Sequence, residues 1–207
     1  MKLLLVRHGK TKWNIAGLSQ GQADLELDEE GRREARAVAL ALRDEDIKLI
    51  YSSPLSRALK TAEEINRFHR VEIRILEELK ELDIGVFDGL SVDEIKRRYG
   101  EEMRRFWEGG DYTVRIPGGE SLQELYDRAR RGLDRILGET CGLEGAVAVV
   151  GHFFCLRMVI CALLGLDISC FRRIWLNEGS LSIFEISPGR APRLLLLNDL
   201  CHLSHER

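Results

Sequence analysis

The sequence predicts an α/β fold with three layers, in which a mainly parallel central sheet carries helices on both faces. Short apolar runs typical of buried strands alternate with longer amphipathic segments typical of helices. The 207 residues are 44% hydrophobic and 31% charged, which suits a globular chain whose core needs neither a disulfide nor a metal. We expect residues 1–207 to form a single domain.

The expected strands are short apolar runs that end at polar or turn residues. They are Lys2–Val6, IKLIYS (47–52), VEIRIL (71–76), AVAVVG (146–151), LSIFEI (181–186) and RLLLLN (193–198). The last two runs flank the turn material SPGRAP, so we expect them to pair as the closing strands of the sheet.

Capping residues mark where the expected helices begin. Asp28 is a good N-cap for a helix that runs to about Arg43. Ser53 suits the cap position of a second helix, with Pro54 at the first helical position. Two capping boxes predict further helices, and their pairs are Ser91 with Glu94 and Ser121 with Glu124.

Polar residues follow several of the expected strands at the ends where ligands bind in parallel sheets. Arg7 and His8 come directly after the first strand, and His152 follows the strand at 146–151. Arg57 lies in the first turn of the helix after the second strand, and Glu81 follows the third strand by a few residues. A mainly parallel sheet would bring all five side chains to one edge.

This set of residue types suits phosphate chemistry. Two arginines and a helix N-terminus can bind the oxygens of a small dianion. Asn14 can donate one more hydrogen bond, and Gly9 leaves room for the backbone to approach a ligand closely. Nearby cations disfavour the protonated imidazole, so a neutral His8 could attack phosphorus while Arg7, Arg57 and His152 stabilise the transition state.

Glu81 is the candidate proton donor to the leaving alkoxide. Three other carboxylates lie close to it in the sequence, at Glu77, Glu78 and Asp83. The residues alone therefore do not single out Glu81 from a charged, solvated loop.

Composition argues against several other classes of protein. The net charge is −3, without the basic excess of a nucleic-acid binder. The five cysteines are odd in number and form no C-x-x-C, which favours reduced residues and a cytoplasmic location. We expect neither a membrane span nor a secretory signal, because the apolar runs are too short or contain charges.

The chain resembles the histidine phosphatase superfamily, also called the phosphoglycerate mutase-like group, in motifs that span nearly its whole length. Those motifs are VRHG, GQADLELDEEGRREA, IYSSPLSRALKTAE, LKELDIGVFDGLSVDEI, PGGESLQELYDR, VVGHFF and LLLLNDLCHL. The resemblance implies a phosphoglycerate mutase-like fold and a phosphohistidine intermediate. It also implies that no metal or other cofactor is needed.

The resemblance implies a role for each matching residue. His8 would be the nucleophile, with Glu81, His152, Arg7 and Arg57 as the other catalytic residues. The implied phosphate or substrate ligands are Arg7, Asn14, Gln20, Gly21, Arg57, His152 and Phe153. The partner would be a small phosphorylated metabolite.

Two features depart from the family pattern. Lys10 stands where an acidic residue or glutamine is usual, and Phe153 and Phe154 stand where small residues are usual. The phenylalanines suggest a partly apolar leaving group.

Within the superfamily, the expected activity is a metal-independent phosphomonoesterase of the broad-specificity or α-ribazole phosphatase branch. A cofactor-dependent phosphoglycerate mutase, a phosphate-binding module without catalysis and a metallohydrolase are the alternatives. The stretch around 91–120 combines aromatic and basic residues. It predicts a helical lid insertion over the site, or else an ordinary amphipathic helix with a solvated face.

Overall fold

The computed structural model describes residues 1–108 and 110–206. Gly109, inside the expected lid, and Arg207 lie outside the described residues. Six strands form one sheet in the order β3-β2-β4-β1-β5-β6. The strands are β1 Lys2–Arg7, β2 Ile47–Ser52, β3 Ile73–Ile75, β4 Ala146–Gly151, β5 Leu181–Glu185 and β6 Arg193–Asp199. The first four strands are parallel, and β5 and β6 run antiparallel as the expected closing pair.

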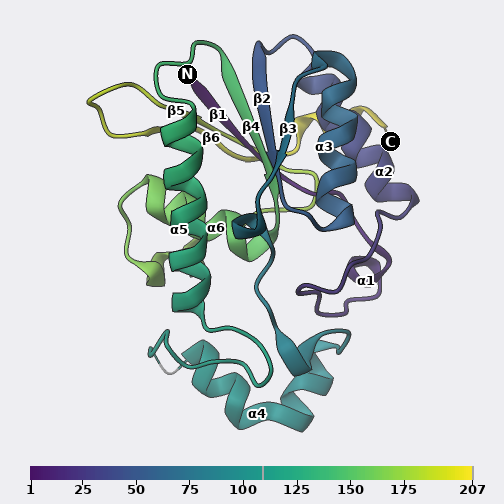
Figure 1. Cartoon of the computed structure of the whole chain (residues 1–207). Coiled ribbons are helices and arrows are strands. Elements are labelled where there is room, and N and C mark those ends of the chain that lie inside the picture. Colours follow the sequence, from purple (N-terminus) through teal and green to yellow (C-terminus); the bar gives the residue numbers. More distant parts are fainter. Residues whose placement is uncertain (109, 207) are drawn as a thin grey trace.

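Helices cover both faces of this sheet, which confirms the α/β fold predicted from the sequence (Figure 1). The helices are α1 Lys12–Ile15, α2 Glu29–Ala41, α3 Ser56–His69, α4 Val92–Glu108, α5 Leu122–Glu139 and α6 Phe153–Leu163. Short 3₁₀ turns are η1 Glu77–Leu79, η2 Gly85–Phe87, η3 Ile168–Arg173 and η4 Cys201–Glu206. None of the helices in residues 1–108 and 110–206 has the length and apolarity needed to cross a membrane.

The strand β4 shows why its sequence is apolar without interruption. Ala148 and Val150 face the core formed with α2 and α3, whereas Val147 and Val149 face the core formed with α5 and α6. Alternate residues of a strand point to opposite faces, so a strand covered on both sides needs apolar residues throughout.

Helix caps agree with the sequence at three places and differ at one. The Asp28 side chain accepts the Gly31 N–H, and both predicted capping boxes form. By contrast, α3 begins at Ser56, not at the expected Ser53 and Pro54.

The later start of α3 has a local cause. The Asp24 carboxylate accepts the backbone N–H and the hydroxyl of Ser56, which caps the helix from a distant loop. Ser53 is used elsewhere, because its hydroxyl accepts the Leu55 N–H and lies 2.8 Å from His152 Nε2. Capping rules based on neighbouring residues cannot predict a cap that a distant part of the chain provides.

Parallel pairing brings the polar segments after the strands together. Arg7 at the end of β1 is in register with Gly151 at the end of β4, so His8 and His152 follow neighbouring strand ends. Ser52 on β2 is in register with Val150, which brings the start of α3 to the same edge. Figure 1 shows α1 and α4 near this end of the sheet.

The loop after β1 packs against the first turn of α2 through two glycines. A Cβ at Gly9 would collide with the Gly31 carbonyl, and a Cβ at Gly31 would collide with the backbone of Lys10. We expected Gly9 to leave room for a ligand. The close neighbour in the structure is α2, so the small residue is required for packing of the loop that carries His8.

This contact predicts that Gly31→Ala lowers the free energy of unfolding by about 1–3 kcal/mol, because backbone atoms cannot give way cheaply. Gly138→Ala is the matched control, since it is also helical and its Cβ would meet no atom within 4 Å. The control should be neutral or stabilising by about 0.5–1 kcal/mol. Urea denaturation of both variants measures the difference, and equal stabilities would contradict the packing account.

Candidate active site

His8 is held by two hydrogen bonds that define its protonation. Its Nδ1 lies 2.7 Å from the Gly9 carbonyl oxygen, and its Nε2 lies 3.2 Å from Arg57 Nε. A carbonyl can only accept and a guanidinium can only donate. Nδ1 must therefore carry the proton, and the lone pair of the ring is on Nε2.

Burial and neighbouring charge both favour this neutral form. Only 3% of His8 is exposed. Loss of hydration lowers the pKa of His8 well below its ordinary value, and the positive charges of Arg57 and Arg7 lower it further. The ring is consequently uncharged near neutral pH.

His152 lies beside His8, with 5.0 Å between the ring centroids. Its Nε2 is 2.8 Å from the Ser53 hydroxyl, whereas its buried Nδ1 has no hydrogen-bond partner among the described residues. The pKa of His152 is also well below its ordinary value, chiefly because of burial and then because of Arg57. The sequence correctly predicted the meeting of the two rings, but gave no indication of Ser53 as a partner.

Arg57 carries its charge into the centre of the site. Its terminal nitrogens donate to the carbonyls of Ala23 at 2.8 Å and Gly21 at 2.7 Å. Only 1% of the side chain is exposed, and burial lowers the pKa of Arg57 to about 10. It lies in the first turn of α3, as the sequence predicted.

Arg7 is held by hydrogen bonds to the loop before β5. Its Nη1 donates to the Leu176 carbonyl and its Nη2 to the Glu178 carboxylate, both at 2.6 Å. Its buried Nε has no partner among the described residues. Burial lowers the pKa of Arg7, and the charge of Glu178 opposes that effect. Sequence reasoning missed Glu178, because it belongs to an irregular loop with no periodic pattern.

Glu81 is the buried member of its carboxylate cluster. Its side chain accepts backbone N–H groups from Leu82 at 2.8 Å, Phe154 at 3.1 Å and Cys155 at 3.2 Å. The last two belong to the first turn of α6. Burial raises the pKa of Glu81, while these N–H donors and the positive charges of Arg57 and Arg7 oppose the rise.

The neighbouring carboxylates are engaged elsewhere. Glu77 pairs with Lys80 with 70% of its side chain exposed, and Asp83 accepts the Gly85 N–H. Glu81 is 4% exposed, and its charge opposes the lowering of the pKa values of Arg7 and Arg57 that burial causes. The structure thus separates Glu81 from the rivals that the sequence left open.

Arg128 on α5 supports the segment that carries Glu81. Its guanidinium donates to the carbonyls of Glu78, Lys80 and Glu81 at 2.9, 2.8 and 3.1 Å. A salt bridge to Glu120 completes its contacts. Nothing in the sequence indicated this function, because the contact joins two distant segments.

The predicted ligands in the loop after α1 are already hydrogen-bonded within the protein. Asn14 Oδ1 accepts the Thr11 N–H at 3.0 Å, which leaves the amide NH₂ as its donor. Gln20 Oε1 lies 2.7 Å from the Thr11 hydroxyl, whereas its buried Nε2 has no hydrogen-bond partner among the described residues. The Gly21 N–H donates to Asp88, and the Gly21 carbonyl holds Arg57, so both of its backbone groups are engaged.

The two phenylalanines that depart from the family pattern are half-buried and pack against neighbouring side chains of the protein. The Phe153 ring lies 4.8 Å from the Arg7 guanidinium and 4.4 Å from that of Arg157. The Phe154 ring lies 5.4 Å from Trp107 at the end of α4. Their partners are thus arginines and an aromatic cluster, and the partly apolar leaving group stays a prediction.

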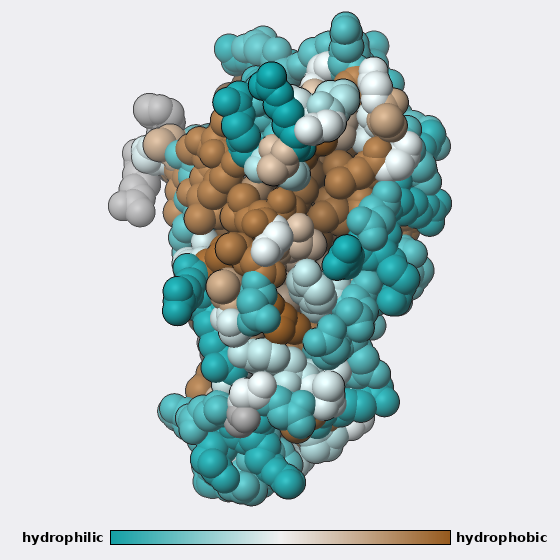
Figure 2. All heavy atoms as spheres, turned by 90° about the vertical axis from the view of Figure 1, so that its left-hand side faces the viewer, coloured by the Kyte–Doolittle hydropathy of each residue, from teal (hydrophilic) through white to brown (hydrophobic). Residues whose placement is uncertain are grey.

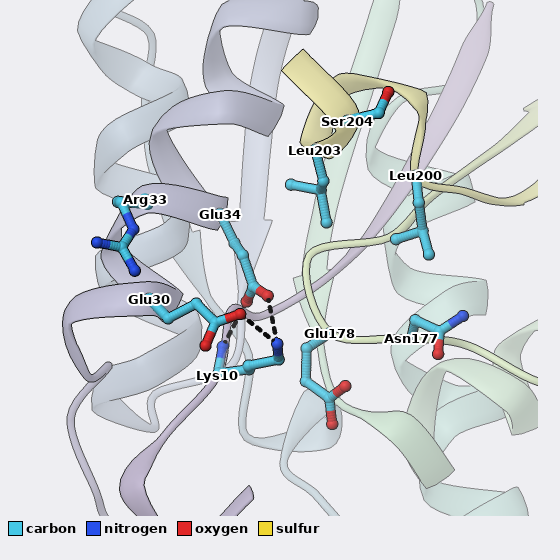
Figure 3. A pocket seen from close by; sticks show the side chains of 9 residues that line it. All are labelled: Lys10, Glu30, Arg33, Glu34, Asn177, Glu178, Leu200, Leu203 and Ser204. Atoms are coloured by element: carbon cyan, nitrogen blue, oxygen red, sulfur yellow. Dashed lines mark hydrogen bonds and ion pairs between the residues drawn. The ribbon is translucent and has the colours of Figure 1, made fainter. Parts of the chain in front are cut away.

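Lys10 points into a cavity of about 550 Å³ beside the site (Figure 3). Its ammonium pairs with Glu30 and Glu34, and its backbone N–H donates to Glu34 at 2.8 Å. Glu178, the partner of Arg7, also lines this cavity. The unusual lysine at position 10 therefore links the loop that carries His8 to α2 through its ion pairs.

The arrangement as a whole is that of an anion-binding α/β enzyme. Two arginines and two neutral histidines meet at the carboxyl edge of a parallel sheet, and Arg7 Nε and His152 Nδ1 remain unpartnered among the described residues. Buried polar atoms without a partner are costly, and a bound anion would satisfy the Arg7 Nε–H and also His152 Nδ1 when that nitrogen carries the ring proton. The family model described as "Histidine phosphatase superfamily (branch 1)" matches residues 3–200, and the chain belongs to this superfamily.

Two relatives match most of the chain, one named as a phosphatase and one as a mutase. It is 36% identical over 203 residues to phosphoserine phosphatase 1 of Hydrogenobacter thermophilus, which covers 98% of this chain and 94% of the relative. It is also 36% identical over 182 residues to a Salmonella choleraesuis protein named "probable phosphoglycerate mutase GpmB", covering 88% and 83%. The predicted superfamily and enzyme class are confirmed.

A solved structure gives the same fold. A histidine-to-alanine mutant of phosphoserine phosphatase from Entamoeba histolytica, in complex with phosphoserine, superposes with a TM-score of 0.84. The two chains are 28% identical, and the match covers 98% of each.

Proposed function

We propose that this chain hydrolyses phosphomonoesters of small metabolites without a metal ion, through a phosphoryl group carried on His8. The observation that carries the proposal is the neutral His8 ring, whose Nε2 lone pair faces Arg57 Nε at 3.2 Å. A neutral, oriented imidazole is a nucleophile, whereas a cationic one is not.

The first step transfers the phosphoryl group to the enzyme. When a phosphate dianion binds, the Arg57 Nε–H donates to a phosphate oxygen instead of His8 Nε2. The freed lone pair forms the N–P bond as the P–O bond to the leaving group breaks. Arg7 Nε, which is a buried donor without a partner among the described residues, stabilises the charge on the non-bridging oxygens. His152 does the same from Nδ1 in the tautomer whose Nε2 accepts a hydrogen bond from the Ser53 hydroxyl.

The other predicted ligands complete this phosphate site in the proposal. The amides of Asn14 and Gln20 and the backbone N–H of Phe153 donate to the remaining oxygens. Gly21 acts through its carbonyl, which orients Arg57.

Glu81 handles the protons of both steps. Protonated Glu81 gives its proton to the leaving alkoxide, and the resulting carboxylate then takes a proton from the attacking water. Water forms the new P–O bond, the N–P bond breaks, and phosphate leaves with His8 neutral again. The raised pKa of Glu81 fits a group that begins the cycle protonated.

Phosphoserine is the first substrate to test, since relatives with that activity or ligand match nearly the whole chain. The segment around 91–120 acts as a cover in this proposal, because α4 reaches the site through the Trp107–Phe154 contact. A phosphoglycerate mutase is the second candidate, on the likeness to the Salmonella protein.

A kinetic panel tests the proposed function. It comprises phosphoserine, 3-phosphoglycerate, α-ribazole phosphate and p-nitrophenyl phosphate, each measured with and without a chelator. We expect turnover that the chelator does not reduce, and a loss of at least about a thousandfold in His8→Ala. His69→Ala, at the far end of α3, should keep full activity.

Each alternative has its own outcome in this panel. Interconversion of phosphoglycerates that depends on bisphosphoglycerate priming, with negligible hydrolysis, would identify a mutase. Phosphate binding without turnover would indicate a binding module. Activity lost to the chelator and restored by zinc or manganese would contradict the metal-independent mechanism.

Glu81→Gln should slow esters with poor leaving groups by about 10²–10⁴-fold, because the alkoxide then leaves without a proton. p-Nitrophenyl phosphate should be affected much less, since p-nitrophenolate is a stable anion. Single-turnover rates for phosphoserine and p-nitrophenyl phosphate make the comparison. Equal slowing of the two substrates would mean that Glu81 does not protonate the leaving group.

A further inference from the structure

The segment that carries Glu81 has no regular structure of its own. Residues 80–84 lie between the 3₁₀ turns η1 and η2 and belong to neither a helix nor a strand. The backbone of such a segment cannot satisfy its polar groups internally, so other parts of the chain must do so. The position of Glu81 therefore depends on groups that reach this segment from elsewhere.

A single guanidinium, that of Arg128 on α5, collects the carbonyls of this segment. It donates to the carbonyls of residues 78, 80 and 81, and the Glu81 carbonyl also accepts a hydrogen bond from Gln22 Nε2 at 3.0 Å. The donors of a guanidinium point in fixed directions within one plane. Their convergence on consecutive turns of the backbone therefore defines where the main chain of Glu81 lies.

The Glu120 carboxylate fixes this guanidinium in turn. Arg128 donates to both carboxylate oxygens, at 2.5 Å from Nη2 and at 3.4 Å from Nε. The same carboxylate accepts the Asp83 N–H at 2.9 Å, and the Glu120 N–H donates to the Asp83 carbonyl at 2.9 Å. Arg128 and Glu120 together thus hold the main chain on both sides of the Glu81 side chain.

The salt bridge between these two residues is mostly buried, and burial decides what it can contribute. The exposed fractions of the side chains are 16% for Arg128 and 13% for Glu120. Removing two charges from water costs about as much as their attraction gains, so a buried pair adds little net stability. Its hydrogen bonds are directional, however, so the pair can fix the geometry of the groups that it contacts.

Glu120 also marks the end of the segment around 91–120. The turn before it packs tightly, since a Cβ at Gly119 would lie 2.3 Å from the Asp83 carbonyl oxygen. α4 projects from the end of the molecule in Figure 1, and Figure 2 shows that its surface on that side is mostly hydrophilic. The junction at Glu120 therefore joins a solvated cover firmly to the segment of Glu81.

We infer that Arg128 and Glu120 are positioning residues for proton transfer by Glu81. Their hydrogen bonds reach the backbone around Glu81, whereas the first turn of α6 binds its carboxylate. A displacement of the acid by about 1 Å can cost about a hundredfold in rate. The inference rests on the function proposed above, and in particular on Glu81 as the proton donor to the leaving group.

Single-turnover rates test the inference with p-nitrophenyl phosphate and with the alkyl ester of the panel that the wild-type chain hydrolyses fastest. Arg128→Ala should slow the alkyl ester at least about tenfold more than the aryl ester, because only the alkoxide needs a proton to leave. Arg128→Lys keeps the charge without the planar fork, and should show the same selectivity with a smaller loss. Arg130→Ala is the matched control on α5, since 62% of the Arg130 side chain is exposed, and both rates should stay unchanged. Circular dichroism of each variant reports on folding.

A double-mutant cycle with Glu81→Gln separates positioning of the acid from a general effect on the fold. If Arg128 acts through Glu81, adding Arg128→Ala to Glu81→Gln should change the ratio of alkyl to aryl rates by less than about twofold. Equal slowing of both esters by the two Arg128 variants, or full additivity with Glu81→Gln, would overturn the inference and leave the proposed function intact. Glu81→Gln without selectivity would overturn the proposed proton donor, and this inference with it.

Discussion

The site depends on keeping His8 uncharged while surrounding it with positive charge. The Gly9 carbonyl accepts a hydrogen bond from His8 Nδ1–H, and Arg57 Nε donates a hydrogen bond to the lone pair on His8 Nε2. The contact with Arg57 would be unfavourable with a cationic ring, because a guanidinium cannot donate to a nitrogen that already carries a proton. The Gly9 carbonyl fixes the proton on Nδ1 but by itself raises the pKa of His8, so burial and the two arginines keep the ring neutral. The same contacts orient the ring, so protonation and geometry are controlled together.

The two arginines are held in different ways. Arg57 donates its terminal nitrogens to carbonyls, which satisfy its hydrogen bonds without cancelling its charge. Arg7 has a carboxylate partner in Glu178, and its charge is partly balanced. The charge of Arg57 near His8 is therefore less balanced than that of Arg7. In agreement with this, Arg57 lowers the pKa of His8 more than Arg7 does.

Much of this could be predicted from the sequence, because strand ends and helix starts are local features. Apolar runs located the strands, and the rule for parallel sheets brought Arg7, His8 and His152 to one edge. Residues that act through long-range contacts were missed, as with Glu178 and Arg128, since no local pattern marks them. The predicted start of α3 was wrong for the same reason, because Asp24, which caps the helix, is distant in the sequence.

The most direct measurement is long-range ¹H–¹⁵N NMR of the histidine rings, with the His8 signals assigned by their loss in His8→Asn. The account predicts that His8 is neutral at neutral pH with its proton on Nδ1. Its titration midpoint should fall well below that of an ordinary histidine, because burial and two arginines oppose protonation. A cationic His8 at neutral pH, or a ring protonated on Nε2, would contradict it.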